Sequence, residues 1–125
     1  MNVLRIGFVG TRTENFQQTA EFFHEVLGLP AAFQKPDWTG FRLPTGKNDF
    51  VEVFGPAMQD TKFFPEGVSG VLVAFIVDDL VAAYAEAAEA GVELLSEPVW
   101  VGEGFGWFFL RAPDGNLYTI QQVPE

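Results

Sequence analysis

Apolar and polar residues alternate along several short segments of this chain, and two of these segments share one layout. In both, an alternating run leads into a turn that contains proline and glycine, and a second alternating run follows. A period of two is typical of β-strands, and proline with glycine between two such runs indicates a turn. The two copies are residues 41–54 (FRLPTGKNDFVEVF) and residues 110–121 (LRAPDGNLYTIQ). The pattern therefore predicts a strand–turn–strand element that occurs twice.

Alignment of the two copies on their turns pairs residues of different chemistry. Arg42 matches Arg111, and Glu52 matches Thr119 when two residues of the first copy are treated as an insertion. A carboxyl group in one half of the chain therefore has a hydroxyl group as its counterpart in the other half.

Two further segments place apolar residues at helical spacing, and a glycine ends each of them. The first helix is expected to be capped by Asn15 and to stop at Gly28. The second is expected to be capped by Asp78 or Asp79 and to stop at Gly91. The strands expected beside them are residues 3–10, 31–35, 38–43, 49–54, 70–77, 92–95, 99–101, 106–111 and 116–122. With the interrupted stretch 92–101 counted as one strand, the order β-α-β-β-β occurs twice, which indicates an internal duplication.

The length of 125 residues fits a single domain that can bury its own core. We expect one domain over residues 1–125, with a first module of about 1–55 and a second of about 70–125. Residues 56–69 are expected to connect the modules, and their Phe63-Phe64 pair is a candidate for the rim of a binding site. The predicted fold class is α+β, with tandem βαβββ modules.

The charge balance narrows the possible partners. Seven basic and 17 acidic residues give a net charge of −10. This charge opposes contact with phosphate groups, so we expect neither nucleic acid nor a membrane as a partner. No run approaches the roughly 20 apolar residues that span a bilayer, and the N-terminus lacks the features of a signal peptide. With no cysteine present, a cytoplasmic location is expected.

Two short motifs accompany this order of elements. They are residues 22–29 (FFHEVLGL), at the end of the first helix, and residues 112–116 (APDGN), at the second turn. Together they resemble the glyoxalase/bleomycin-resistance/extradiol-dioxygenase superfamily, also called the vicinal-oxygen-chelate superfamily. The resemblance covers essentially the whole chain. It implies a curled, cup-shaped mixed sheet with helices outside and the ligand inside, and it implies a homodimer. Several chemistries share this fold, so the resemblance leaves the function open.

In metal-using relatives the ligands come from the first and last strands of each module. Carried over by position, they fall on Arg5, Glu52, Leu72 and Thr119. Arg5 has a permanent positive charge, Leu72 has no lone pair, and Thr119 is a weak neutral donor. The one histidine, His24, is expected in the first helix. Because a metal centre needs several convergent donors, we expect neither a metal nor another cofactor.

Arg5 and Glu52 are expected to face the same half of the cup as an ion pair. One interpretation is that the pair only satisfies itself, because a lone buried charge is costly. The other is that Glu52 positions Arg5 to bind a ligand carboxylate or other oxyanion. Glu52 is also the only candidate catalytic residue. Pairing with Arg5 is expected to lower its pKa and make it a poor base near neutrality.

Two more arginines and two tryptophans share the inward direction of the strands. Arg42 and Arg111 either add positive charge to the cup or reach solvent or a neighbouring acid at the strand ends. Trp38 and Trp107 are expected to line a pocket, because an indole N–H needs a partner and the ring can stack on a ligand. The candidate ligand-binding residues are therefore Arg5, Trp38, Arg42, Glu52, Trp107 and Arg111.

Three functions follow from these observations. The first is a metal-free superfamily member that binds a small organic molecule, anionic if the arginines line the cup. The second is a divergent lyase, isomerase or dioxygenase that uses Glu52. The third is a structural or dimeric protein whose cup is filled by its own side chains.

Overall fold

The computed structural model of this chain describes residues 1–45, 49–58 and 70–124. The chain folds as two compact units. The first unit is Phe8–Val71, and the second unit is Leu72–Glu125 together with Met1–Gly7. The expected modules began at residues 1 and 70, so the division differs at the N-terminus. The first seven residues belong with the second half of the chain, because they pack on its side chains.

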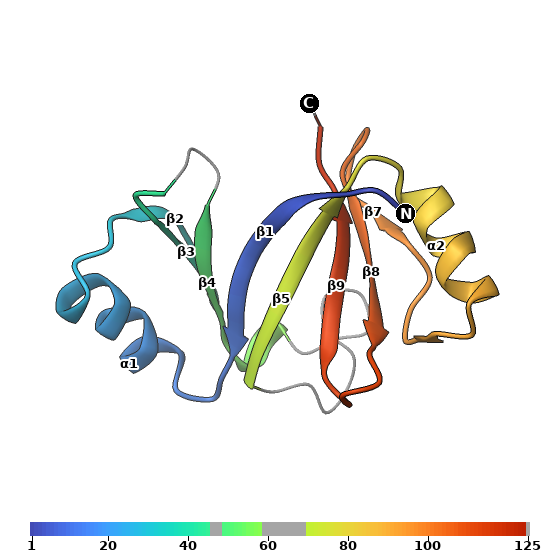
Figure 1. The fold of residues 1–125 in the computed structure, drawn as a ribbon. Helices are drawn as coiled ribbons and strands as arrows, with labels where there is room; N and C mark the ends of the chain where they lie inside the picture. Colours follow the sequence, from blue (N-terminus) through green and yellow to red (C-terminus); the bar gives the residue numbers. More distant parts are fainter. Residues whose placement is uncertain (46–48, 59–69, 125) are drawn as a thin grey trace. The chain divides into compact units, whose positions relative to one another are not determined.

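The first unit contains a four-stranded sheet and one helix (Figure 1). Its strands are β1 (Val3–Arg12, of which residues 8–12 belong here), β2 (Ala31–Lys35), β3 (Trp38–Arg42) and β4 (Phe50–Phe54). Their order is β2-β3-β4-β1. The pairs β2–β3 and β3–β4 are antiparallel, whereas β4 and β1 are parallel. A short 3-10 turn, Pro56–Met58, follows β4.

Helix α1 (Phe16–Glu21) covers one face of this sheet, and its ending differs from the expected one. It continues as a π-helical turn over Phe22–Val26, in which the Leu27 N–H donates to the Phe22 carbonyl (3.1 Å). Gly28 then ends the helical segment with a φ of +71°, as its position predicts. The expected side-chain cap is wrong, because the side chain of Asn15 makes no capping hydrogen bond.

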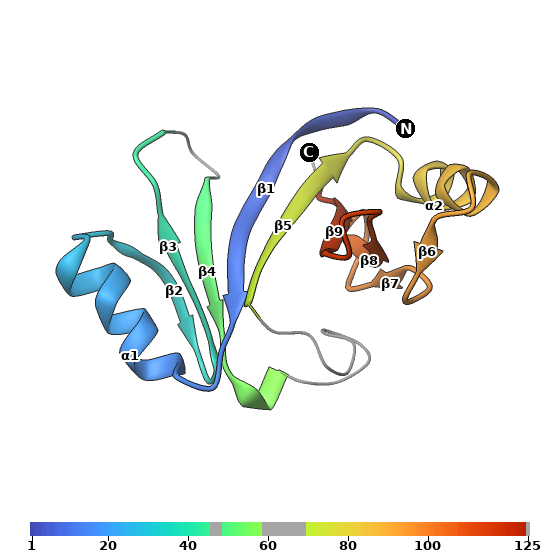
Figure 2. The same ribbon diagram turned by 60° about the horizontal axis from the view of Figure 1, so that its bottom comes forward.

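The second unit repeats the same plan (Figure 2). Its elements are β5 (Gly70–Val77, of which residues 72–77 belong here), α2 (Leu80–Glu89), β6 (Glu93–Leu94), β7 (Val99–Trp100), β8 (Gly106–Arg111) and β9 (Leu117–Gln122). The strand order is β5-β9-β8-β6, and β7 also pairs with β8. Strands β5 and β9 are parallel, while β9–β8 and β8–β6 are antiparallel. The predicted tandem βαβββ plan of the α+β class is therefore confirmed.

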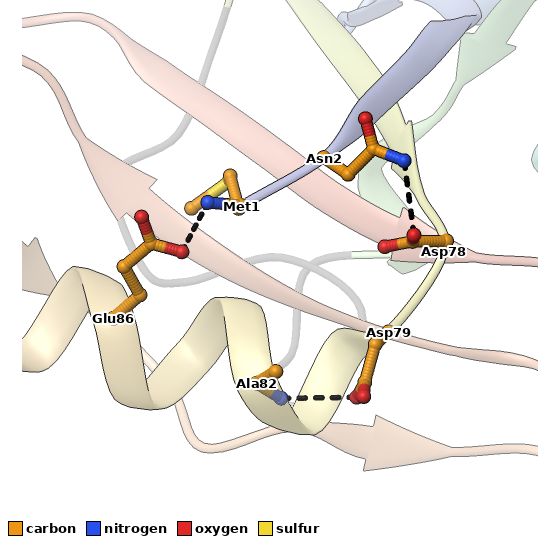
Figure 3. Close-up of polar contacts among 6 residues, drawn as sticks. All are labelled: Met1, Asn2, Asp78, Asp79, Ala82 and Glu86. Atoms are coloured by element: carbon orange, nitrogen blue, oxygen red, sulfur yellow. Dashed lines mark hydrogen bonds and ion pairs between the residues drawn. The ribbon is translucent and has the colours of Figure 1, made fainter.

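Polar contacts hold the start of α2 and the N-terminus of the chain in this unit (Figure 3). Asp79 caps the helix by accepting a hydrogen bond from the Ala82 N–H (3.0 Å), which decides between the two expected caps. Asn2 donates to Asp78 (2.9 Å), and the N-terminal amine pairs with Glu86. The core beneath α2 is formed by Val77, Leu80, Ala83, Phe108 and Ile120.

Two predictions about connecting segments concern residues outside the described ranges. These are the Gly46 end of the first turn and the Phe63-Phe64 rim. Within the described ranges, no helix is both long enough and apolar enough to cross a membrane.

Candidate functional site

Glu52 lies in the middle of β4, on the sheet face opposite α1. It is in register with Gly40 of β3 on one side and with Gly10 of β1 on the other. Phe41, the neighbour of Gly40, points the other way and packs on Phe23 beside α1 (ring centroids 6.0 Å apart). Because successive side chains alternate between faces, Glu52 projects away from the helix.

The two flanking glycines allow aromatic rings to close around the Glu52 carboxyl group. A Cβ atom on Gly40 would overlap the Phe33 ring. A Cβ atom on Gly10 would lie 3.0 Å from the Phe54 ring and 3.1 Å from the Phe8 ring. These rings leave Glu52 only 7% exposed.

The indole of Trp38 is the hydrogen-bond partner of this carboxyl group. Trp38 Nε1 donates to Glu52 Oε1 at 2.7 Å. The indole is itself held by neighbours, since it stacks on Phe54 (6.0 Å, 20°) and meets Phe33 edge-on (5.1 Å, 74°). The Lys35 ammonium lies 4.9 Å from the indole centroid. The carboxyl group therefore has a fixed neutral hydrogen-bond donor.

Burial raises the pKa of Glu52 from its ordinary 4.5 to about 7, and the Trp38 hydrogen bond acts in the opposite direction. The lowered pKa expected from the sequence is wrong in sign. Removal of the carboxylate from water dominates, and one neutral hydrogen bond does not offset it.

Arg5 does not occupy the position assigned to it by alignment. Phe8 lies two residues before Gly10, the partner of Glu52, just as Leu72 lies two residues before Ala74, the partner of Thr119. Phe8 is therefore the counterpart of Leu72 on β1, and the assignment of Arg5 is corrected by three residues.

Arg5 and Glu52 each have partners other than the expected one. The exposed Arg5 side chain donates to the carbonyl of Ile6 at 3.4 Å. Glu52 is buried and accepts from Trp38.

The other candidates differ in their surroundings. Arg42 is exposed, and its guanidinium lies 5.2 Å from the centroid of the Phe50 ring, its partner in register. Arg111 is also exposed and contacts Glu93 (3.1 Å) and the Gly115 carbonyl (3.0 Å). Arg111 therefore pairs with a neighbouring acid, Glu93, which was one of the two alternatives expected for it.

Trp107 belongs to the second unit and is half-buried there. It meets Phe105 edge-on at 5.6 Å and is in register with Gln121. Thr119, two residues earlier on β9, is 3% exposed. Its hydroxyl oxygen has no hydrogen-bond partner among the described residues.

The donors at the family metal positions do not suit a metal ion. Phe8 and Leu72 offer no lone pair, which leaves the Glu52 carboxyl group and the Thr119 hydroxyl. No group of three or more His, Cys, Asp or Glu side chains in the described part of the chain could hold a metal.

Arg12 is a buried residue of this face that the sequence interpretation missed. It is in register with Phe54, so it lies on the same face as Glu52. Its side chain is only 10% exposed, and Nη1 bonds to Glu14 at 2.9 Å. The Nε atom is buried without a hydrogen-bond partner among the described residues. The sequence shows that Arg12 follows Gly10 by two residues and so shares its strand face. It does not show that Gly10 is in register with Glu52.

Comparison with known proteins places this chain in a family. A sequence profile described as the Glyoxalase/Bleomycin resistance protein/Dioxygenase superfamily matches residues 5–120. The chain belongs to this superfamily. The match confirms the family resemblance that was inferred from the two motifs. No curated protein sequence matches it.

Solved structures share the fold of this superfamily member at low sequence identity. A methylmalonyl-CoA epimerase from Streptomyces coelicolor is 20% identical, with 98% of this chain and 100% of that chain covered and a TM-score of 0.73. A superfamily member from Vibrio splendidus is 24% identical, with 96% and 99% covered and a TM-score of 0.70. A Mn(II)-bound glyoxalase from Novosphingobium aromaticivorans is 21% identical, with 96% and 39% covered and a TM-score of 0.71. Identities this low support the fold alone.

Proposed function

We propose that this superfamily member binds a small organic molecule on the aromatic face around Glu52, without the family metal. The observation that carries the proposal is a buried carboxyl group whose hydrogen-bond partner is the neutral indole of Trp38. A buried ionisable group costs folding free energy unless something compensates it, and such groups are concentrated at functional sites. Aromatic walls with a few polar anchors are typical of small-molecule sites.

Titration calorimetry tests the binding proposal. The purified chain is titrated with panels of acidic and of basic aromatic molecules, in parallel with Trp38→Phe and with the exposed-residue control Trp100→Phe. We expect binding that weakens in Trp38→Phe and is unchanged in Trp100→Phe. No heat from either panel would instead favour a structural protein whose site is filled by its own side chains.

Metal analysis of the purified protein tests the metal-free part. We expect less than stoichiometric Zn, Ni, Fe or Mn after dialysis. A stoichiometric metal that is lost in Glu52→Gln would contradict this part and favour a metal-dependent lyase or dioxygenase.

A second candidate is proton transfer by Glu52, as in an isomerase. The raised pKa favours it, because a general acid or base works best when its pKa lies near the working pH. A structural neighbour is a methylmalonyl-CoA epimerase, which supports testing carbon acids next to a carbonyl group. We expect the chain to exchange such a proton with deuterium in heavy water, and Glu52→Gln to abolish the exchange without loss of fold.

We also propose a homodimer, on the basis of the family resemblance. Leu4 and Ile6 share one face at the start of β1 and are each about half exposed, and neighbouring exposed apolar residues are typical of association surfaces. Light scattering after gel filtration is expected to give twice the 13.8 kDa chain mass.

A further inference from the structure

Arg12 is the described side chain of the first unit whose burial is least explained by its partners. Its guanidinium has one carboxylate partner, Glu14, which is itself 71% exposed. The buried Nε–H donates to no described residue. A buried donor left without an acceptor costs about 1–3 kcal/mol, and more on a charged group. The contacts among the described residues therefore leave this donor without an acceptor.

The position of Arg12 relates it directly to Glu52. Arg12 is in register with Phe54 on β4, two residues beyond Glu52, and all three side chains share one sheet face. Strand spacing puts the Cα atoms of Arg12 and Glu52 roughly 8 Å apart. A small molecule held at Glu52 can therefore also reach the guanidinium.

The chemistry of the unused edge specifies the ligand group. Glu14 occupies Nη1, which leaves the edge of the guanidinium that carries Nε–H. Arginine binds carboxylate and phosphate through two parallel N–H bonds, and this edge supplies that geometry.

We propose that Arg12 is the anion-binding residue of the Glu52 site, and that the ligand carries a carboxylate or a comparable oxyanion. This inference rests on the proposed binding function. It replaces the expected anion site at Arg5, which is exposed and donates to a backbone carbonyl. The ligand oxyanion supplies the acceptor that Nε lacks, while Phe54 and the neighbouring rings contact the apolar part of the molecule.

Matched pairs of probes test the charge requirement. The full chain is titrated with acetate, benzoate and phenylacetate, each against its amide, and the Arg Nε–Hε signals are followed by NMR. The chain has four arginines, so the Arg12 signal is assigned by its absence in Arg12→Gln. We expect at least one carboxylate to shift this signal saturably and to bind at least about tenfold tighter than its amide.

Three variants separate Arg12 from other causes. Arg12→Gln is expected to reduce carboxylate affinity at least about tenfold and to change amide affinity less than about twofold. Arg5→Gln, the matched control, is expected to change neither. Glu14→Gln removes the negative charge beside the guanidinium and is expected to raise carboxylate affinity severalfold. If Arg12→Gln does not fold by circular dichroism, Arg12→Lys replaces it, because lysine keeps the charge but has no guanidinium fork.

Two failures are distinguishable. Equal binding of acids and amides, unchanged by substitution of Arg12, would overturn the anion assignment and leave the binding function standing. Absence of binding by every probe would contradict the binding function and the assignment of Arg12 together.

Discussion

Glycine residues on both sides of Glu52 set the electrostatics of its carboxyl group. Side chains at Gly10 and Gly40 would occupy the space now taken by the rings of Phe8, Phe33 and Phe54. The rings keep water from the carboxylate, and the pKa of Glu52 rises to about 7.

The raised pKa predicts how stability depends on pH. Between pH 4.5 and about 7 the folded state binds more protons at Glu52 than the unfolded state does, so stability falls as pH rises through this window. The change is on the order of 3 kcal/mol. Glu52→Gln should remove this fall and be more stable than the parent at pH 8 by up to about that amount. Urea unfolding from pH 4.5 to 8 measures it.

The control for this prediction is Glu25→Gln, which changes an exposed glutamate. It should follow the pH profile of the parent chain. A difference between Glu52→Gln and the parent that stays constant with pH would show that the fold does not raise the pKa of Glu52.

Substitution of Trp38 tests the hydrogen bond to the carboxyl group. The bond lowers the pKa of Glu52, so Trp38→Phe should raise that pKa further. The ¹³C chemical shift of the Glu52 carboxyl carbon, followed against pH, measures the change. Trp100→Phe serves as the control, because Trp100 is 44% exposed and lies on β7. An unchanged titration in Trp38→Phe would contradict the assignment.

The two units repeat the same arrangement of strands and helix, although the residues at matching positions differ. In each unit the last strand is parallel to the first, and a helix covers the face opposite the duplicated position. The two helices differ at their ends. Asp79 caps α2 through its side chain, whereas α1 has no side-chain cap and ends in a π-helical turn. Local interactions therefore support α2 more strongly than α1.

Removal of the α2 cap should destabilise the chain measurably. Asp79→Ala deletes the acceptor for the Ala82 N–H and should cost about 1 kcal/mol. Asp78→Ala is the matched control, because Asp78 only accepts from Asn2 at the exposed surface. It should cost less than about 0.5 kcal/mol. Urea unfolding of the two variants compares them, and equal losses would contradict the capping role of Asp79.

At the scale of the whole molecule, the second unit is discontinuous in sequence. It takes its first residues from the N-terminus, and Gly7 lies against the side chains of Ile76 and Gln121. A Cβ atom on Gly7 would be 2.7 Å from Ile76 Cδ1, closer than real Cβ contacts occur. The start of β1 can therefore pack closely on this unit because Gly7 has no side chain.

A double-mutant cycle tests this packing. Gly7→Ala should destabilise the chain by about 1–3 kcal/mol through overpacking. Ile76→Val removes Cδ1, so Gly7→Ala should cost clearly less in that background. Urea unfolding of the four proteins gives the coupling. Additive losses would show that the two positions do not meet.

The sequence predicted most of the strands and both helices. The strands expected at residues 31–35, 70–77 and 106–111 have the same ends in the structure. Gly28 and Gly91 marked the helix ends, because both adopt the positive φ that glycine allows. Each of these signals comes from residues that are close together in the chain, so it can be recognised from the sequence alone.

The candidate site was predicted less well. Glu52 and Trp38 were expected on the same sheet face, because their direction follows from alternation along their own strands, and their hydrogen bond agrees with this. Arg5 was expected beside Glu52, whereas Gly10 is the residue of β1 that is in register with Glu52. The register between two strands far apart in the sequence is set by packing of whole elements.

The amino-acid sequence by itself determined the duplicated order of elements and the superfamily. Each follows from residue types and short-range spacing. Only the tertiary structure decided the raised pKa of Glu52 and the position of Arg12 on the same sheet face. Both depend on which side chains from distant strands come together and how completely they exclude water.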